Sequence, residues 1–284
     1  MTTERTLRTV HTGLDFGEGP RWHDGRLWYS DFYRHGVFTL DAAGVEERVV
    51  TVDGQPSGLG WLPDGTLLIV SMTDRRVLAL GPDGELRRHA DLSSVVAHHC
   101  NDMVVAADGT AYVGNFGFDL ENAAAPESTV LLRVASDGTV HVAADDVWFP
   151  NGSVITPDDR TLIVGETFAG RYTAWDIAAD GSLRNRRVWA ELEGSTPDGC
   201  CLDADGAIWM ADVVNRRFQR VHEGGEVSAT IPVDGLAVAC MLGGDDGRTL
   251  PLLVSPGTHP DQVAGEGRST ILTTRVAVPG AGRP

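Results

Sequence analysis

The sequence contains no lysine: all 23 basic residues are arginines, against 40 aspartates and glutamates, and the formal net charge is −17. Without lysine there is no Schiff-base nucleophile, no lysine base and no Walker A phosphate loop. The acidic excess repels phosphate backbones and anionic lipid, so we expect neither nucleic acid nor a membrane surface as a partner. Any catalysis therefore depends on carboxylates, amides, histidine, hydroxyl or thiol groups.

The chain also has few cysteines and no long apolar run. No segment approaches the roughly 18 consecutive apolar residues of a membrane helix, and residues 1–10 have no apolar signal segment. The four cysteines include the adjacent pair Cys200 and Cys201 and form no CxxC motif. This usage favours reduced, buried thiols, and we expect a cytoplasmic protein. Only residues 91–98 and 120–125 have a pattern compatible with a turn or two of helix.

An internal repeat is present instead. A turn followed by a short apolar run occurs six times, as in HDGRLWYSD, PDGTLLIVS and ADGAIWMAD, at intervals of 40 to 50 residues. The turn positions are Gly25, Gly65, Gly109, Asp159, Gly206 and Gly247. Asp-Gly between apolar runs is typical of a tight β-hairpin, and a second series of turns lies between the copies. Each period thus holds about four strands, the content of a propeller blade.

We therefore predict an all-β fold: a six-bladed β-propeller with four-stranded antiparallel blades, forming one domain over residues 1–284 with a short flexible tail from about residue 279. The runs 6–12 and 268–278 each lack a hairpin partner, and pairing the N-terminal with the C-terminal strand closes the ring and protects its edges. A pair of β-sandwiches or a helix-containing fold fits less well, because no linker interrupts the repeat.

The repeat also defines six equivalent positions at the start of each first strand, where the strands of a propeller line its channel. The residues at these positions are Glu18, Ser57, Asn101, Asn151, Asp198 and Ala239. A carboxylate in a narrow channel is costly unless it is paired, and no lysine is available. Two carboxylates with amide oxygens suit Ca²⁺, Mg²⁺ or Mn²⁺ better than Zn²⁺. We expect one bound divalent cation, and Ca²⁺ is the ion that we favour most. The alternative interpretation is that Asn-Gly and Asp-Gly are turn dipeptides without chemistry.

Four motifs in order, EGPRWHDGRLWYSD, CNDMVVAADGTAYVGN, FPNGSVITPDDRTLIVGET and TPDGCCLDADGAIWMAD, resemble the SMP-30/gluconolactonase/luciferin-regenerating-enzyme family of six-bladed propellers. The resemblance runs from about residue 12 to residue 255. It implies metal-dependent hydrolysis of a lactone or ester, with the metal on Glu18, Asn151 and Asp198. It also implies that Asn101 lies near metal and substrate and that Asp198 is the general base.

The chain departs from the family pattern Arg-x-Asn-Asp-Gly, in which sugar-acid lactonases use the arginine on the substrate. The segment HHCNDM has His99 in place of that arginine and Met103 in place of the glycine, which weakens the expectation of gluconolactone. His99 is a candidate catalytic proton shuttle or, alternatively, a hydrogen-bonded spacer. Aromatic residues in predicted loops suggest a more apolar substrate, unless they only pack between blades. They are Phe116, Phe118, Trp148, Phe149 and Phe168, of which we take Phe116 and Trp148 as substrate-binding candidates.

Together these features predict a divalent-metal-dependent hydrolase of a small-molecule lactone or related ester, monomeric or homodimeric, in which the metal polarises the carbonyl and activates water. Two alternatives stay open. One is a non-catalytic calcium-binding or regulatory propeller, and the other is an enzyme of the same scaffold acting on an aromatic natural-product substrate. A serine nucleophile is not supported, since the chain has no GxSxG motif.

Overall fold

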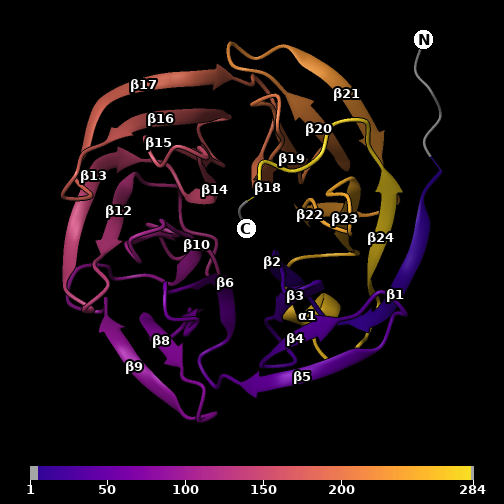
Figure 1. The fold of residues 1–284 in the computed structure, drawn as a ribbon, viewed down its shortest axis with the longest axis horizontal. Helices are drawn as coiled ribbons and strands as arrows, with labels where there is room; N and C mark the ends of the chain where they lie inside the picture. Colours follow the sequence, from indigo (N-terminus) through magenta and orange to yellow (C-terminus); the bar gives the residue numbers. More distant parts are fainter. Residues whose placement is uncertain (1–5, 283–284) are drawn as a thin grey trace.

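Six small antiparallel sheets surround a central channel in the computed structural model, which describes residues 6–282 (Figure 1). Each sheet has four strands, and in the first five the strands follow the chain from the channel outward. The predicted six-bladed propeller is thus confirmed. Its blades form because Asp-Gly turns with positive φ, such as those at Gly65 and Gly109, connect neighbouring strands that are buried along almost their whole length.

The strand bounds of the first three blades are as follows. Blade 1 contains β2 (Gly17–His23), β3 (Arg26–Asp31), β4 (Gly36–Leu40) and β5 (Glu46–Thr51). Blade 2 contains β6 (Pro56–Trp61), β7 (Leu67–Ser71), β8 (Arg76–Leu80) and β9 (Leu86–Asp91). Blade 3 contains β10 (Cys100–Val105), β11 (Ala111–Asn115), β12 (Thr129–Val134) and β13 (Val140–Val147).

The remaining blades complete the ring. Blade 4 contains β14 (Pro150–Ile155), β15 (Thr161–Glu166), β16 (Arg171–Ile177) and β17 (Leu183–Glu191). Blade 5 contains β18 (Pro197–Leu202), β19 (Ile208–Asp212), β20 (Arg217–Val221) and β21 (Val227–Pro232). Blade 6 contains β22 (Leu236–Cys240), β23 (Thr249–Ser255), β24 (Ser269–Arg275) and the N-terminal strand β1 (Arg8–Leu14).

Blade 6 joins the two ends of the chain. Strand β1 pairs antiparallel with β24, with Arg8 opposite Thr273 and Leu14 opposite Ser269. The predicted ring closure is therefore confirmed. It satisfies the backbone groups that would otherwise form an open edge on β24.

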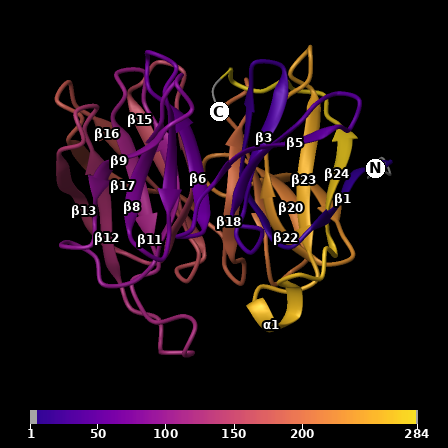
Figure 2. The same cartoon turned by 90° about the horizontal axis from the view of Figure 1, so that it is seen from below.

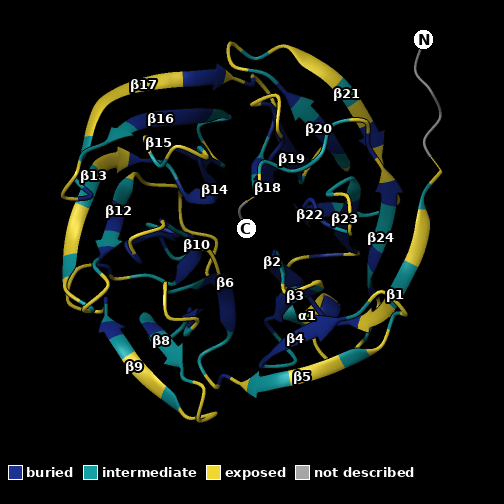
Figure 3. Cartoon of the chain, viewed as in Figure 1, coloured by how far each residue is buried: buried dark blue, intermediate teal, exposed yellow. Residues whose placement is uncertain are grey.

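Burial follows the distance from the channel (Figure 3). The first five residues of β2 are all buried, whereas β5, at the outside of the same blade, has no fully buried residue. The inner strands contact the strands of neighbouring blades on both sides, so they are covered throughout. The outer strands alternate between the space between blades and solvent, as expected for a sheet covered on one face.

Long loops distinguish the two faces of the ring. The helix α1 (Pro260–Val263), between β23 and β24, and the loop between β11 and β12 project from one face, and the C-terminal segment lies at the other (Figure 2). The segments 91–98 and 120–125, the two expected candidates for helix, form turns. Among residues 6–282, no helix is long and apolar enough to cross a membrane.

The tail expected to be flexible is held in place along part of its length. Ala204 N–H donates to Pro279 O (2.8 Å), and Ala281 N–H donates to Leu202 O (3.0 Å). These hydrogen bonds join the tail to blade 5 at the end of the channel opposite α1, and the flexibility expected of the tail stays a prediction. Residues 283–284 lie outside the described part of the chain.

Candidate active site

An irregularity in the first strand of every blade positions the site residues. The pairing register shifts between Glu18 and Arg21 in blade 1, between Pro150 and Ser153 in blade 4 and between Pro197 and Cys200 in blade 5, and similar shifts occur in the other three blades. Such β-bulges bend a strand and re-aim its side chains. Asn151 and Asp198 lie within these bulges as the second residue of β14 and β18. The interpretation of their Asn-Gly and Asp-Gly pairs as hairpin turns is therefore wrong.

The glycines that follow Asn151 and Asp198 have a packing role. A Cβ atom on Gly152 would lie 2.3 Å from the carbonyl oxygen of Asp198, and one on Gly199 would lie 2.4 Å from the Cβ of Ala239. Both distances are too short for any side chain. The glycines thus let the inner strands of adjacent blades approach closely, which brings Asn151 beside Asp198.

In blade 6, the residue predicted for the equivalent position is not the one that the structure places there. The second residue of β22 is Ala237, not the expected Ala239. The physical reason is a longer hairpin: β22 ends at Cys240 and β23 begins only at Thr249. Ala239 and Ser57 are both buried, and neither lines the cavity described next.

A cavity of about 240 Å³ lies at the mouth of the channel, between α1 and the β11–β12 loop. Its lining includes six of the seven residues predicted for the site: Glu18, His99, Asn101, Phe116, Asn151 and Asp198. These residues come from blades 1, 3, 4 and 5, so only ring closure brings them together. Their individual roles stay predictions.

Trp148 is the predicted residue that does not line the cavity, and its neighbour Phe149 does. Phe149 has a positive φ of 54°, which turns the chain just before β14. The backbone N–H of Trp148 donates to Glu166 Oε2 (2.9 Å) and fixes that turn. Phe116 and Phe149 stack with ring centroids 4.6 Å apart. Phe118 and Phe168 pack against Phe149 outside the cavity lining.

Two carboxyl groups at the cavity floor have strongly perturbed acidity. Burial, together with the negative charges of Asp198 and Asp102, raises the pKa of Glu18 well above its usual value. Burial also raises the pKa of Asp198 to about 8, against a lowering effect of the hydrogen bond from Asn151. Within residues 6–282, neither carboxyl group forms an ion pair with an arginine or histidine. The charge of Arg21 lowers the pKa of Glu18, but this effect is smaller than the effect of burial.

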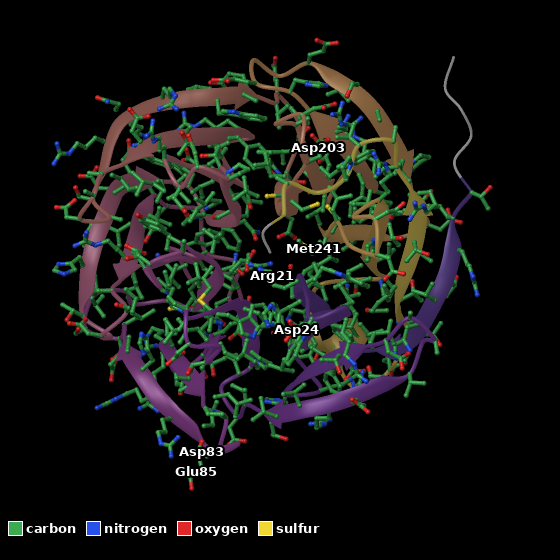
Figure 4. All side chains as sticks on the ribbon, in the orientation of Figure 1. Arg21, Asp24, Asp83, Glu85, Asp203 and Met241 are labelled. Carbon is green, nitrogen blue, oxygen red and sulfur yellow. The ribbon has the colours of Figure 1, made fainter. Side chains whose placement is uncertain are left out.

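The nearest candidate counterpart, Arg21, is engaged elsewhere. Its Nη2 donates to Asp102 Oδ1 (2.7 Å) and to the carbonyl oxygen of Met103, and its Nε and Nη1 donate to the carbonyl oxygens of Leu59 and Pro20. Figure 4 shows Arg21 near the centre of the ring. Arg21 was not among the residues predicted for the site, although an arginine within a strand predicted to line the channel was a usable signal.

The donor set of the floor fits a hard divalent cation. It combines the carboxylates of Glu18 and Asp198 with the amides of Asn101 and Asn151. The buried Nδ2 atom of Asn101 has no hydrogen-bond partner among the described residues. Over the same part of the chain, no three His, Cys, Asp or Glu side chains converge as metal ligands. The set is thus half amide, with oxygen donors that suit Ca²⁺ or Mg²⁺ better than a soft metal.

Thr167 positions the amide of Asn151. Its hydroxyl donates to Pro197 O (2.7 Å) and accepts a hydrogen bond from Asn151 Nδ2 (3.2 Å). Because the hydroxyl proton is already donated to a carbonyl, Asn151 presents its N–H₂ group to Thr167 and keeps Oδ1 for other partners. Thr167 was not among the residues predicted for the site, because it comes after the last residue of β15 and has no local signature of this role.

Buried acids at the ends of second strands fix the loops that lead into the site. Asp31 accepts hydrogen bonds from the N–H groups of Asp15 and Phe16 (3.0 and 3.1 Å), and Asp212 accepts one from Thr196 (2.9 Å). Glu166 has the same role towards blade 4, and all three are fully buried. Their shared place after the turn is a repeat signal that the sequence analysis did not use.

His99 lies on the cavity wall with its ring centroid 5.6 Å from that of Phe116. Burial lowers its pKa below the usual value, against the opposing charge of Glu121, whose Oε1 is 3.9 Å from Nδ1. His99 is therefore neutral at pH 7 and able to accept a proton. Its role as proton shuttle stays a prediction.

The cysteines are structural. All four are free and buried, and burial raises the pKa of Cys100 to about 12. A thiol with this pKa is a poor nucleophile at neutral pH.

Fold and site together define a class: a six-bladed β-propeller with carboxylate and amide groups at the mouth of its channel. The chain belongs to the family described as SMP-30/gluconolactonase/LRE-like region, which matches residues 16–255. It is 28% identical over 209 residues to the pentonolactonase XacC of Haloferax volcanii, covering 72% of this chain and 69% of that protein. It is 27% identical over 241 residues to regucalcin of Gallus gallus, covering 81% and 80%. A solved structure of a luciferin-regenerating enzyme superimposes with a TM-score of 0.83 at 16% identity, covering 97% of both chains, and so shares the fold.

Proposed function

We propose that this protein hydrolyses a lactone or a related ester and requires a bound divalent cation to do so. The observation that carries the proposal is the pair Glu18 and Asp198, two carboxyl groups of raised pKa at the floor of one cavity, with no ion-pair partner among the described residues. Family membership and the 28% identity to a pentonolactonase support the reaction class.

Glu18, Asn151 and Asp198 would hold the cation, which when bound supplies a Lewis acid for the carbonyl oxygen and lowers the pKa of a nearby water. Ca²⁺ is the first expectation for this oxygen-rich set, with Mg²⁺, Mn²⁺ and Zn²⁺ as alternatives. In the loaded site Asp198 is ionised, because a neighbouring positive charge lowers the pKa of a carboxyl group.

Asp198, Asn101 and His99 then have separate roles in the reaction. Asp198 takes a proton from the attacking water as the new carbon–oxygen bond forms. Asn101, whose Nδ2 is buried without a partner among the described residues, donates a hydrogen bond to the carbonyl oxygen as negative charge develops there. When the ester bond breaks, the proton held by Asp198 passes to the leaving alkoxide. Neutral His99 at the wall can relay it.

The test combines cation analysis with a lactone screen. Purified protein is expected to hold about one divalent ion per chain, and chelation is expected to abolish hydrolysis of lactones in a pH-indicator assay. Asp198→Ala is expected to lose both cation and rate while keeping the fold by circular dichroism. Full activity of metal-free Asp198→Ala protein contradicts the mechanism.

A role in binding without turnover is the second candidate, favoured by the similarity to regucalcin. It uses the same cation site and predicts that the ion binds with the same residues. The two candidates differ in one measurement: a protein that only binds shows no hydrolysis of any lactone or aryl ester with any cation in the screen.

A further inference from the structure

Two groups of aromatic side chains line the cavity at the mouth of the channel. In blade 1, Phe16 lies 5.0 Å from Phe32 and 6.2 Å from Tyr33, measured between ring centroids. On the other side, Phe116 and Phe149 stack at 4.6 Å with an angle of 19° between their planes. Blade 1 and blade 4, which Phe149 precedes, lie on opposite sides of the ring (Figure 1). All five rings line the same cavity, above the floor that holds the carboxyl groups.

These walls offer little to a substrate rich in hydroxyl groups. The Tyr33 hydroxyl already donates to the carbonyl oxygen of Thr258 (3.0 Å), and Met72 adds further apolar surface. Polar side chains such as Gln55, Thr258 and His259 line the cavity as well, so the apolar surface available to a substrate is that of the rings, Met72 and Leu120. Hydroxyl groups buried against aromatic faces would lose their hydrogen bonds to water, which is unfavourable. A flat apolar group would instead stack on them.

The charges of the lining disfavour an anionic substrate. Glu18, Asp198 and Glu121 line the cavity, and no arginine is among the described residues that do so. A bound divalent cation balances the first two charges and leaves Glu121 uncompensated. A substrate that carries its own carboxylate or sulfonate would thus meet negative charge without a guanidinium to bind it.

The volume is adequate for a fused ring. An apolar protein cavity of roughly 150 Å³ is known to accept one benzene ring. The cavity here, about 240 Å³, has room for an aromatic ring together with the lactone ring.

We propose that the substrate of this site is a neutral lactone or ester with an aromatic or flat apolar group, which stacks between Phe116 with Phe149 on one side and the blade 1 aromatics on the other. This inference rests on the proposed hydrolysis and names its substrate class. In the reaction, water adds to the carbonyl carbon and the ring carbon–oxygen bond breaks. One proton of the water passes to the leaving oxygen, which becomes a free hydroxyl or phenol, and the other is released to solvent as the new carboxyl group ionises.

The experiment compares three δ-lactones of the same ring size: a benzo-fused lactone, an unsubstituted aliphatic lactone and a polyhydroxylated sugar lactone. The cation-loaded protein is expected to show the highest kcat/KM on the benzo-fused lactone and the lowest on the sugar lactone. Phe116→Leu is expected to reduce the ratio of benzo-fused to aliphatic kcat/KM by roughly three- to tenfold, the range for loss of one aromatic contact.

Phe168→Leu is the matched control. Phe168 contacts Phe149 at 5.2 Å and is 43% exposed, but it does not line the cavity. The control is expected to leave the ratio unchanged. A second measurement needs no turnover and compares, by calorimetry, the binding of two lactams to Asp198→Asn protein. These lactams are analogues that are not hydrolysed. The benzo-fused lactam is expected to bind more tightly than the sugar lactam.

The outcomes separate the two levels of the proposal. If none of the lactones is hydrolysed with any cation, the proposed function fails. If the sugar lactone has the highest kcat/KM, or if Phe168→Leu changes the ratio as much as Phe116→Leu, the substrate class is wrong while hydrolysis stands.

Discussion

The guanidinium of Arg21 binds the carboxylate of Asp102 at 2.7 Å in the interior of the channel, with both side chains about 5% exposed or less. This ion pair uses the arginine that lies in the same strand as Glu18. Its remaining N–H groups bind backbone carbonyl oxygens of blades 1, 2 and 3, so Arg21 also connects these blades. Among the described residues, no arginine or histidine therefore forms an ion pair with Glu18 or Asp198, as the proposed cation site requires.

Breaking this ion pair on one side is expected to be costly. Arg21→Met leaves Asp102 buried without its partner, and we expect a loss of about 3–5 kcal/mol in the free energy of unfolding. The double variant Arg21→Met, Asp102→Asn removes the uncompensated charge and is expected to recover part of that loss. Urea denaturation of the metal-free protein measures both. Equal stability of the single and double variants contradicts a paired Asp102.

The stability of the metal-free protein is expected to fall as pH rises from about 5 to 8. The pKa of Asp198 is raised to about 8 in the folded state, and that of Glu18 is also raised, so the folded state holds protons that the unfolded state has released. Each pKa unit corresponds to about 1.4 kcal/mol, and the stabilising contribution is lost as pH approaches the folded pKa.

Thermal unfolding in chelator at pH 5, 6, 7 and 8 measures this dependence. Asp198→Asn is expected to have a smaller decrease in Tm over the same range, since the amide does not titrate. Saturating Ca²⁺ is expected to raise the Tm of the unmodified protein most at pH 8. If the Tm of the wild-type protein decreases no more than that of Asp198→Asn over this pH range, the Asp198 carboxyl group is not responsible for the pH dependence.

Removing the hydroxyl of Thr167 is expected to weaken cation binding. Thr167→Val deletes the group that orients the Asn151 amide, and loss of such a supporting hydrogen bond typically costs about 10–100-fold in metal affinity. Calorimetric titration with Ca²⁺ measures the effect. Thr167→Ser keeps the hydroxyl and is expected to retain most of the affinity. An unchanged affinity of Thr167→Val contradicts the positioning role.

Adding one methyl group between blades 4 and 5 is expected to disturb the site itself. The Cβ of Gly152→Ala would lie 2.3 Å from the carbonyl oxygen of Asp198, so the two inner strands must move apart. We expect a loss of about 1–3 kcal/mol in stability together with weaker cation binding. The control is Gly206→Asn, in an open turn where asparagine tolerates positive φ, and it is expected to leave cation affinity unchanged. Normal cation affinity of Gly152→Ala contradicts this account.

The sequence by itself determined the blade count, the strand pairing within blades and the placement of Glu18, Asn101, Asn151 and Asp198 in one register. These features are local: an Asp-Gly turn between two short apolar runs specifies a hairpin from a few neighbouring residues, and repetition makes the positions comparable. The end strands were also predictable, because runs without a hairpin partner must pair elsewhere.

Only the tertiary structure decided which side chains reach the cavity. Phe149 lines it in place of Trp148, and Ala237 takes the position expected for Ala239. Arg21 and Thr167 acquire their roles from partners in other blades, many residues away in sequence. The physical reason is shared: bulges, the sign of φ and the choice of hydrogen-bond partner follow from close packing between blades, which no local pattern encodes.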